Sequence, residues 1–138
     1  MTESPRHRAR EIVLKALYAS ECSDEQPGDK LKDLLENEKL SENNQQFARQ
    51  FFAAVLKDVD KADKQISGLT DNWDIGRLAA IDRIILRMAV IELTEIESNP
   101  VKVVINEAIE LAKKYSTAES ARFVNGILDS FARSLNRL

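Results

Sequence analysis

The chain has 138 residues, of which 43% are hydrophobic and 31% charged, and its formal net charge is −3. A chain of this length can bury about two-thirds of the surface that it exposes when unfolded, so it needs no disulfide or metal to fold. Its acidic balance argues against a protein that coats nucleic acid non-specifically.

The cysteine count and the hydropathy pattern bear on the compartment. A single cysteine, Cys22, excludes an intramolecular disulfide and favours a reducing compartment. The richest apolar run, around residues 84–93, is interrupted by Arg87 and Glu92 and is shorter than the roughly 18 residues of a membrane span. The N-terminus carries arginines where a secretory signal has an apolar core. The sequence therefore predicts a soluble, cytoplasmic protein with no membrane association.

Charge is distributed unevenly along the chain. Residues 1–20 hold four basic and two acidic side chains, a net charge of +2, and residues 101–138 hold six and four, again +2. Residues 21–64 hold seven basic and eleven acidic side chains, and residues 70–100 hold three and six. The two basic ends would form one basic face if they met in space.

The apolar spacing is helical along the chain, and no segment alternates as a strand does. Ser4 followed by Pro5 is typical of a helix start, and the first helix is predicted to run to about residue 21. A loop with Pro27 and Gly28 precedes a short, charged helix. The apolar side of that helix consists of Leu31, Leu34 and Leu35.

A third helix is predicted from a cap at Ser41 to an end at Gly68. Its apolar stripe consists of Phe47, Phe51, Val55, Val59, Ala62 and Ile66. A turn or short helix around residues 71–75 carries Trp73, the only tryptophan.

The segment 77–96 is apolar on most sides, which is typical of a central, buried helix. Asn99 and Pro100 interrupt the chain before the next amphipathic helix. Ser116 and Glu119 have capping-box spacing and start a last helix. The apolar stripe of that last helix consists of Phe123, Ile127, Phe131 and Leu135.

These elements predict an all-α fold of about seven helices in two packed helical bundles. We expect the division near Gly68, with residues 1–68 forming an N-terminal bundle and residues 69–138 a C-terminal one, together one compact domain. The connections are short, so sequential helices should lie roughly antiparallel.

Residue types that support catalysis are scarce. The only histidine, His7, lies among arginines, and Cys22 has acidic neighbours, unlike a reactive thiolate. A zinc site needs about four nitrogen or sulfur ligands, which exceeds this supply, and the four glycines form no phosphate-binding loop. The sequence predicts a protein that is not an enzyme and uses no cofactor.

The run Arg6-His7-Arg8-Ala9-Arg10 places cations in the first turns of the first helix, where each costs about 0.3–1 kcal/mol of helix stability. An anionic ligand would reverse this cost, because arginine side chains and free backbone N–H groups would bind the same phosphate. A solubilising charged terminus is the alternative interpretation.

Two aromatic residues extend this hypothesis. Tyr18 lies two turns after Arg10 and could stack on a base, although a half-buried core tyrosine is more common. Arg122 and Phe123 occupy the first turns of the last helix, inside the second basic region. Phe123 is either a core residue or a second stacking platform.

Four motifs are spread from end to end of the chain. They are RHRARE with ALY at residues 6–11 and 16–18, DRIILRMA with EL at 82–89 and 92–93, VINEAIELAKK at 104–114, and FVNGILD at 123–129. Together they resemble the bacterial transcription antitermination factor NusB family, and the last two are the most specific.

The resemblance implies an all-helical fold of two bundles and binding of the boxA segment of single-stranded nascent RNA, jointly with NusE, a small-subunit ribosomal protein. It implies a part in the antitermination complex on RNA polymerase, notably in ribosomal RNA synthesis. The implied RNA-binding residues are Arg6, His7, Arg8, Arg10, Tyr18, Glu119, Arg122 and Phe123. Asp82 matches a partner-binding position on the NusE side.

Some of these positions carry further expectations. His7 stands where an arginine is common in the family, and the charge of Glu119 should oppose nearby phosphate. Asn106-Glu107 and Asn125-Gly126 are family hallmarks for which we expect structural roles, Gly126 by letting a neighbouring helix approach closely. The RNA hypothesis also requires the starts of the first and last helices to lie side by side.

Two other interpretations stay open. The first is a protein-interaction adaptor or homodimer that uses its acidic, leucine-rich side and binds RNA only incidentally. The second is the helical domain of some ribosomal RNA cytosine methyltransferases, which the fold also resembles. We expect this chain not to be a complete enzyme of that kind, because it ends at Leu138 without a cofactor-binding domain.

Overall fold

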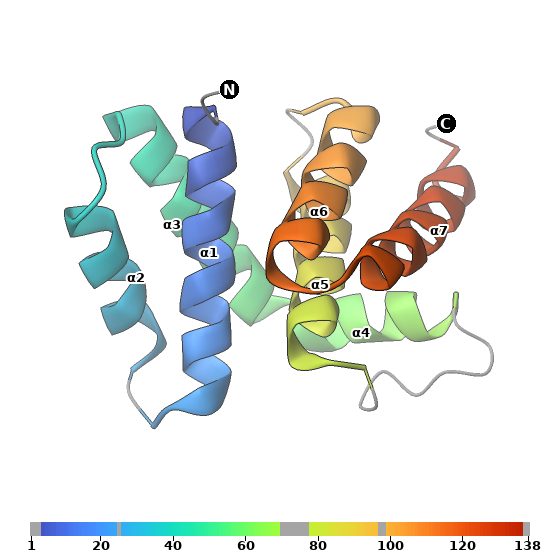
Figure 1. Cartoon of the computed structure of the whole chain (residues 1–138), viewed down its shortest axis with the longest axis horizontal. Coiled ribbons are helices and arrows are strands. Elements are labelled where there is room, and N and C mark those ends of the chain that lie inside the picture. The colour runs from blue at the N-terminus through green and yellow to red at the C-terminus, as the bar shows by residue number, and fades with distance from the viewer. Residues whose placement is uncertain (1–3, 25, 70–77, 97–98, 137–138) are drawn as a thin grey trace. The chain divides into compact units, whose positions relative to one another are not determined.

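The computed structural model describes residues 4–24, 26–69, 78–96 and 99–136. Within these residues the chain forms seven α-helices and no strand, which confirms the predicted all-α fold (Figure 1). The helices are α1 (Pro5–Cys22), α2 (Pro27–Glu36), α3 (Glu42–Lys57), α4 (Val59–Ser67), α5 (Ala80–Glu95), α6 (Val101–Tyr115) and α7 (Ala118–Ser134). None of the described helices is long and apolar enough to span a membrane.

Contacts divide the chain into two compact units, Met1–Ala54 and Val55–Leu138, with the boundary inside α3. The sequence pattern predicts this boundary near Gly68, but α4 packs against α5 and so joins the C-terminal unit. Two hydrogen bonds hold α4 there: Arg87 donates from Nε to Asp63 Oδ1 (2.7 Å) and from Nη2 to Asp63 Oδ2 (2.9 Å). This bidentate, partly buried pair is of the stronger kind of ion pair.

In the N-terminal unit, α1, α2 and α3 run in alternating directions (Figure 1), as their short connections predict. Ser4 caps α1 as expected, since its Oγ accepts a hydrogen bond from the backbone N–H of His7 (3.1 Å). Pro5 is the first helical residue. The buried apolar side of α1 consists of Ala9, Ile12, Val13, Leu14, Ala16 and Leu17.

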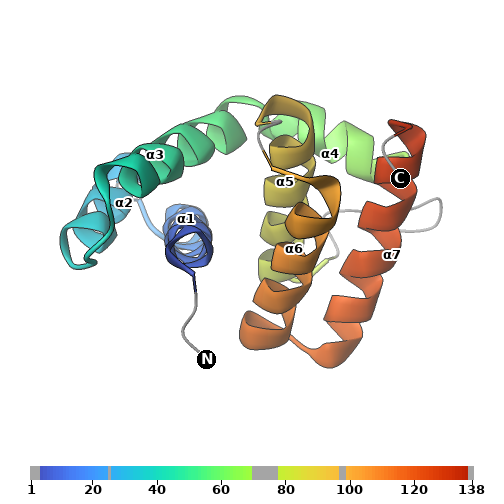
Figure 2. The same cartoon turned by 90° about the horizontal axis from the view of Figure 1, so that it is seen from above.

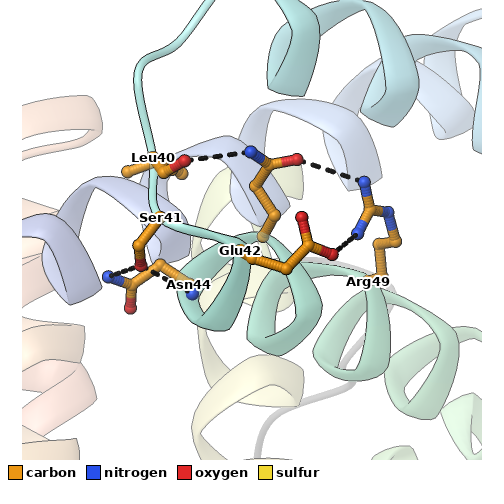
Figure 3. A network of polar contacts seen from close by, with 6 residues as sticks. Leu40, Ser41, Glu42, Asn44 and Arg49 are labelled. Atoms are coloured by element: carbon orange, nitrogen blue, oxygen red, sulfur yellow. Dashed lines mark hydrogen bonds and ion pairs between the residues drawn. The ribbon is translucent and has the colours of Figure 1, made fainter.

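A polar network fixes the start of α3 (Figure 3). Ser41 Oγ accepts from the backbone N–H of Asn44 (3.2 Å) and from its Nδ2 (3.1 Å), which confirms the predicted cap. Gln45 donates to the carbonyl of Leu40 (2.9 Å) and accepts from Arg49 (3.2 Å). The chain is thereby held where it enters α3.

In the C-terminal unit, α5 contacts α4, α6 and α7, so it is the central helix that the sequence predicts. The helices α5, α6 and α7 alternate in direction, and α4 lies across them (Figures 1 and 2). Seven apolar side chains of α5 are at most 2% exposed: Ile84, Ile85, Leu86, Met88, Val90, Ile91 and Leu93. Burial of this one helix therefore organises the unit.

Two predicted helix boundaries were wrong. The helix expected from Ser41 to Gly68 is interrupted at Asp58 (φ −110°, ψ 26°), a residue type that favours helix caps over helix interiors. Gly68 does end the second piece, as predicted. The last helix is capped by Thr117 rather than Ser116, because Thr117 Oγ1 accepts from the backbone N–H of Ser120 (2.9 Å). The element expected near Trp73 lies outside the described residues.

Leu86→Ala in α5 tests the central role of this helix. Leu86 is 0% exposed, so we expect the substitution to lower the free energy of unfolding by about 2–5 kcal/mol. Leu56→Ala is the matched control: Leu56 is 41% exposed, and its truncation should cost less than about 0.5 kcal/mol. Urea unfolding followed by circular dichroism measures the free energy of unfolding of both variants. Equal losses of free energy would contradict the central role of α5.

Candidate nucleic-acid interface

Two of the predicted RNA-binding arginines contact an aromatic ring inside the N-terminal unit. The Cζ atoms of Arg6 and Arg10, one helical turn apart on α1, lie 4.1 and 5.4 Å from the ring centroid of Phe47 on α3. Phe47 is 5% exposed and packs on Phe51 with ring centroids 5.5 Å apart. Arg10 is only 2% exposed. Both guanidinium groups therefore have a structural use in the fold, through cation–π contact.

His7 and Glu11, on the same helix, are buried as well, at 9% and 6% exposure. His7 Nε2 lies 3.6 Å from Glu11 Oε1, so the carboxylate faces the imidazole one turn away. The histidine thus takes part in the packing of α1.

Arg8 and Tyr18 are both more accessible than His7 and Arg10. The Arg8 side chain is 36% exposed, and its Nη1 lies 3.6 Å from Glu38 Oε2. Tyr18 is 41% exposed. A hydrogen bond with Cys22 and the nearby charge of Glu21 raise the pKa of Tyr18, so its phenol stays neutral at physiological pH. Its ring is thus available at the surface as a neutral aromatic face.

In the C-terminal unit, the starts of α5 and α7 enclose a pocket of about 320 Å³. Three of the candidate residues line it: Asp82, Glu119 and Phe123. Ser120 and Thr117, which the sequence analysis did not single out, line it too. The structure therefore brings the predicted partner-binding residue together with two of the predicted RNA-binding residues.

A chain of hydroxyl groups ends on Asp82 in this pocket. Ser116 Oγ and Thr117 Oγ1 both donate to Ser120 Oγ (3.0 Å each), and Ser120 Oγ donates to Asp82 Oδ2 (2.8 Å). Asp82 is 8% exposed, and its Oδ1 has no hydrogen-bond partner among the residues that the structure describes. A buried carboxylate oxygen without a partner is costly, although the positive end of the α5 dipole favours the charge.

Two arginines are neighbours of residues that line this pocket, one through a hydrogen bond and the other along the chain. Arg83 Nη1 donates to the carbonyl of Leu78 (3.3 Å), and Leu78 is a lining residue. Arg122 is exposed and directly precedes Phe123 on α7. The charged residues among the described lining of the pocket, Asp82 and Glu119, are both acidic, and Arg83 is bonded to its edge.

The structure also locates the hallmark motifs. Asn106 and Asn125 are exposed, and Glu107 is half-buried. The role predicted for Gly126 was wrong: a Cβ built there meets no atom of the described residues within 4 Å, so none of the described helices approaches this glycine closely. Within the described residues, no group of three or more histidine, cysteine, aspartate or glutamate side chains is arranged to hold a metal.

The fold and these residues define an all-helical protein with a cluster of cations at the start of its first helix. The NusB family model matches residues 7–133, and the chain belongs to the NusB family.

Individual relatives match along nearly the whole chain. The transcription antitermination protein NusB of Salinibacter ruber is 44% identical over 135 residues, which cover 96% of this chain and 84% of the relative. A solved structure of T. maritima NusB aligns with a TM-score of 0.86 and 36% identity, over 96% of this chain and 93% of that one. A second solved structure contains the antitermination factors NusB and NusE in complex with double-stranded RNA. One of its chains aligns with a TM-score of 0.85 and 25% identity, over 94% of this chain and 97% of that one.

A double-mutant cycle tests the arginine–aromatic contact. We expect Arg6→Gln and Phe47→Leu to couple by about 0.5–1 kcal/mol in the free energy of unfolding, because each variant removes the same cation–π contact. Phe52→Leu, also in α3 and 4% exposed, serves as the control ring. Its coupling with Arg6→Gln should be near zero, and equal coupling for both rings would refute a specific contact.

Proposed function

We propose that this chain is a transcription antitermination factor that binds single-stranded RNA of the boxA type together with NusE, the ribosomal small-subunit protein. In this function it joins the antitermination complex of RNA polymerase in the cytoplasm, notably during ribosomal RNA synthesis. It acts by binding, with neither a catalytic step nor a cofactor. The observation that carries the proposal is the match to the NusB family over residues 7–133. The solved complex of NusB and NusE with double-stranded RNA, one chain of which aligns over 94% of this chain, supports the choice of partners.

The geometry suggests different parts for the N-terminal candidates. Arg8 is the arginine best placed for a phosphate, because its pairing with Glu38 is long and partly exposed. Arg10, at 2% exposure, shapes the surface through Phe47 instead. Tyr18 offers an exposed aromatic face on which a base can stack.

The C-terminal candidates complete the proposed surface. Phe123 supplies a second ring and Arg122 an exposed cation beside it. Glu119, exposed at the pocket, opposes phosphate and limits RNA affinity.

A binding titration tests the proposed function directly. Fluorescently labelled boxA RNA and a scrambled RNA of equal composition are titrated with the protein, with and without NusE, at two salt concentrations. We expect boxA to bind more tightly than the scrambled RNA, NusE to increase the difference, and affinity to fall with salt. Equal affinity for both RNAs in the presence of NusE would overturn the proposal and favour an adaptor with incidental RNA binding.

Arg8→Ala tests the phosphate contact. If Arg8 binds one phosphate of a single strand, its loss should flatten the slope of log affinity against log salt by about 0.7. The fold should be unaffected, because the exposed pair with Glu38 contributes little.

Arg49→Ala is the matched control for Arg8. Arg49 lies in the same unit, is 51% exposed, and has a similar ion pair at 3.7 Å, with Glu42 (Figure 3). Its removal should leave the salt slope unchanged. The same slope for both variants would remove Arg8 from the interface.

Glu119→Gln tests the opposing charge. We expect RNA affinity to rise roughly twofold to fivefold, as loss of one repulsive charge several ångströms from a phosphate predicts. Glu110→Gln, an exposed glutamate of α6 paired with Lys113 at 3.7 Å, is the control and should change affinity less. A weaker complex with Glu119→Gln would place this residue outside the RNA surface.

A further inference from the structure

The arginine that we consider best placed for an RNA phosphate already faces an anion of the protein itself. We propose that the Glu38 carboxylate, from the connection between α2 and α3, occupies the position of a phosphate beside Arg8, and that RNA displaces it on binding. This inference rests on the proposed RNA-binding function. It adds Glu38 as a positioning residue, which lowers RNA affinity by acting through Arg8.

Arg8 differs from the other arginines of its helix in the partner that it has. Arg6 and Arg10 lie over the ring of Phe47. Arg8 Nη1 instead lies 3.6 Å from Glu38 Oε2, and among the described residues neither side chain forms another ion pair. The separation exceeds hydrogen-bond distance, and the two side chains are 36% and 42% exposed. An incoming anion can therefore reach the guanidinium group and replace the carboxylate.

The fold fixes the connection that carries Glu38 at both of its ends. At the end of α2, the backbone N–H and the side-chain Nδ2 of Asn37 both donate to the carbonyl of Asp33 (3.3 and 2.9 Å). Before α3, Leu40 is 7% exposed, and its carbonyl accepts a hydrogen bond from Gln45 (2.9 Å; Figure 3). The backbone on either side of Glu38 is thus held by the N-terminal unit, which keeps the carboxylate near α1.

The dipoles of the two helices explain why these charges pair with each other. Arg8 lies in the first turn of α1, where the positive end of the dipole disfavours a cation. Glu38 follows the last residue of α2, where the negative end disfavours an anion. Because α1 and α2 pack together in opposite directions (Figure 1), each charge compensates the other.

A phosphate at the start of α1 would use the same compensation. It would gain from the Arg8 guanidinium group and from the positive end of the α1 dipole, as Glu38 does. Both anions cannot occupy one position, so binding of the phosphate requires loss of the pair with Glu38. Loss of an exposed ion pair of this kind lowers a binding constant by about twofold to fivefold.

The test is a double-mutant cycle in RNA affinity. Fluorescently labelled boxA RNA is titrated with the full chain in the presence of NusE, for the unaltered protein, Glu38→Gln, Arg8→Ala and the double variant. We expect Glu38→Gln to tighten binding by about twofold to fivefold, because Arg8 no longer has to leave a carboxylate. In the Arg8→Ala background, the same substitution should change affinity by less than about 1.5-fold, since the competition needs both partners.

Glu42→Gln is the matched control. Glu42 lies in the same unit, is exposed, and pairs with Arg49 at 3.7 Å, so the substitution makes the same change of charge and removes a similar ion pair. It measures the general repulsion between a surface carboxylate and RNA. We expect it to change affinity less than Glu38→Gln does. Circular dichroism verifies that all the variants keep the helical content of the unaltered protein.

The outcomes separate the inference from the proposed function. If Glu38→Gln tightens binding equally with and without Arg8, its charge acts on RNA from a distance and the competition is refuted. A weaker complex would mean that the carboxylate orients Arg8 for RNA, and unchanged affinity would mean that it does not compete; either result overturns the inference. In these cases RNA binding itself persists. If the unaltered chain adds nothing to the RNA affinity of NusE alone, the proposed function fails instead.

Discussion

A buried charge must be compensated where it lies, and two such charges account for the arrangement of the candidate residues. Arg10 is 2% exposed, and its guanidinium group lies over the ring of Phe47. Asp82 is 8% exposed and receives the hydrogen bond of Ser120. In the N-terminal unit this constraint ties α1 to α3, and in the C-terminal unit it ties α5 to α7.

The buried charges of Arg10 and Asp82 are not compensated to the same extent. This difference distinguishes a residue that stabilises the fold from one that can bind a ligand. Arg6 and Arg10 share the face of one buried ring, so the like-charge pair on α1 is offset inside the fold. Asp82 uses one oxygen, and the other has no partner among the described residues. A group that is only partly satisfied gains free energy when a ligand completes its hydrogen bonds, whereas a satisfied group gains little. Asp82 is therefore better suited to ligand recognition than Arg10.

The sequence was sufficient to predict the helices and the central position of α5, because apolar spacing and burial on all sides depend on local composition. The sequence was insufficient to predict features that depend on contacts between residues far apart in the chain. The cost of cations at the start of α1 suggested a phosphate, but Phe47, 37 positions after Arg10, supplies part of the compensation. Likewise, the apolar stripe from Phe47 to Ile66 continues across Asp58, so the stripe alone could not reveal that the helix ends there.

The use of Arg10 and Arg6 within the fold has a consequence for how RNA is held in the proposed function. Because Arg6 and Arg10 lie over an internal ring, fewer of the arginines of α1 remain for phosphate, and affinity from counterion release grows with the number of phosphates contacted. In the proposed function, base stacking and cations that a second protein brings would then contribute a larger share of the affinity.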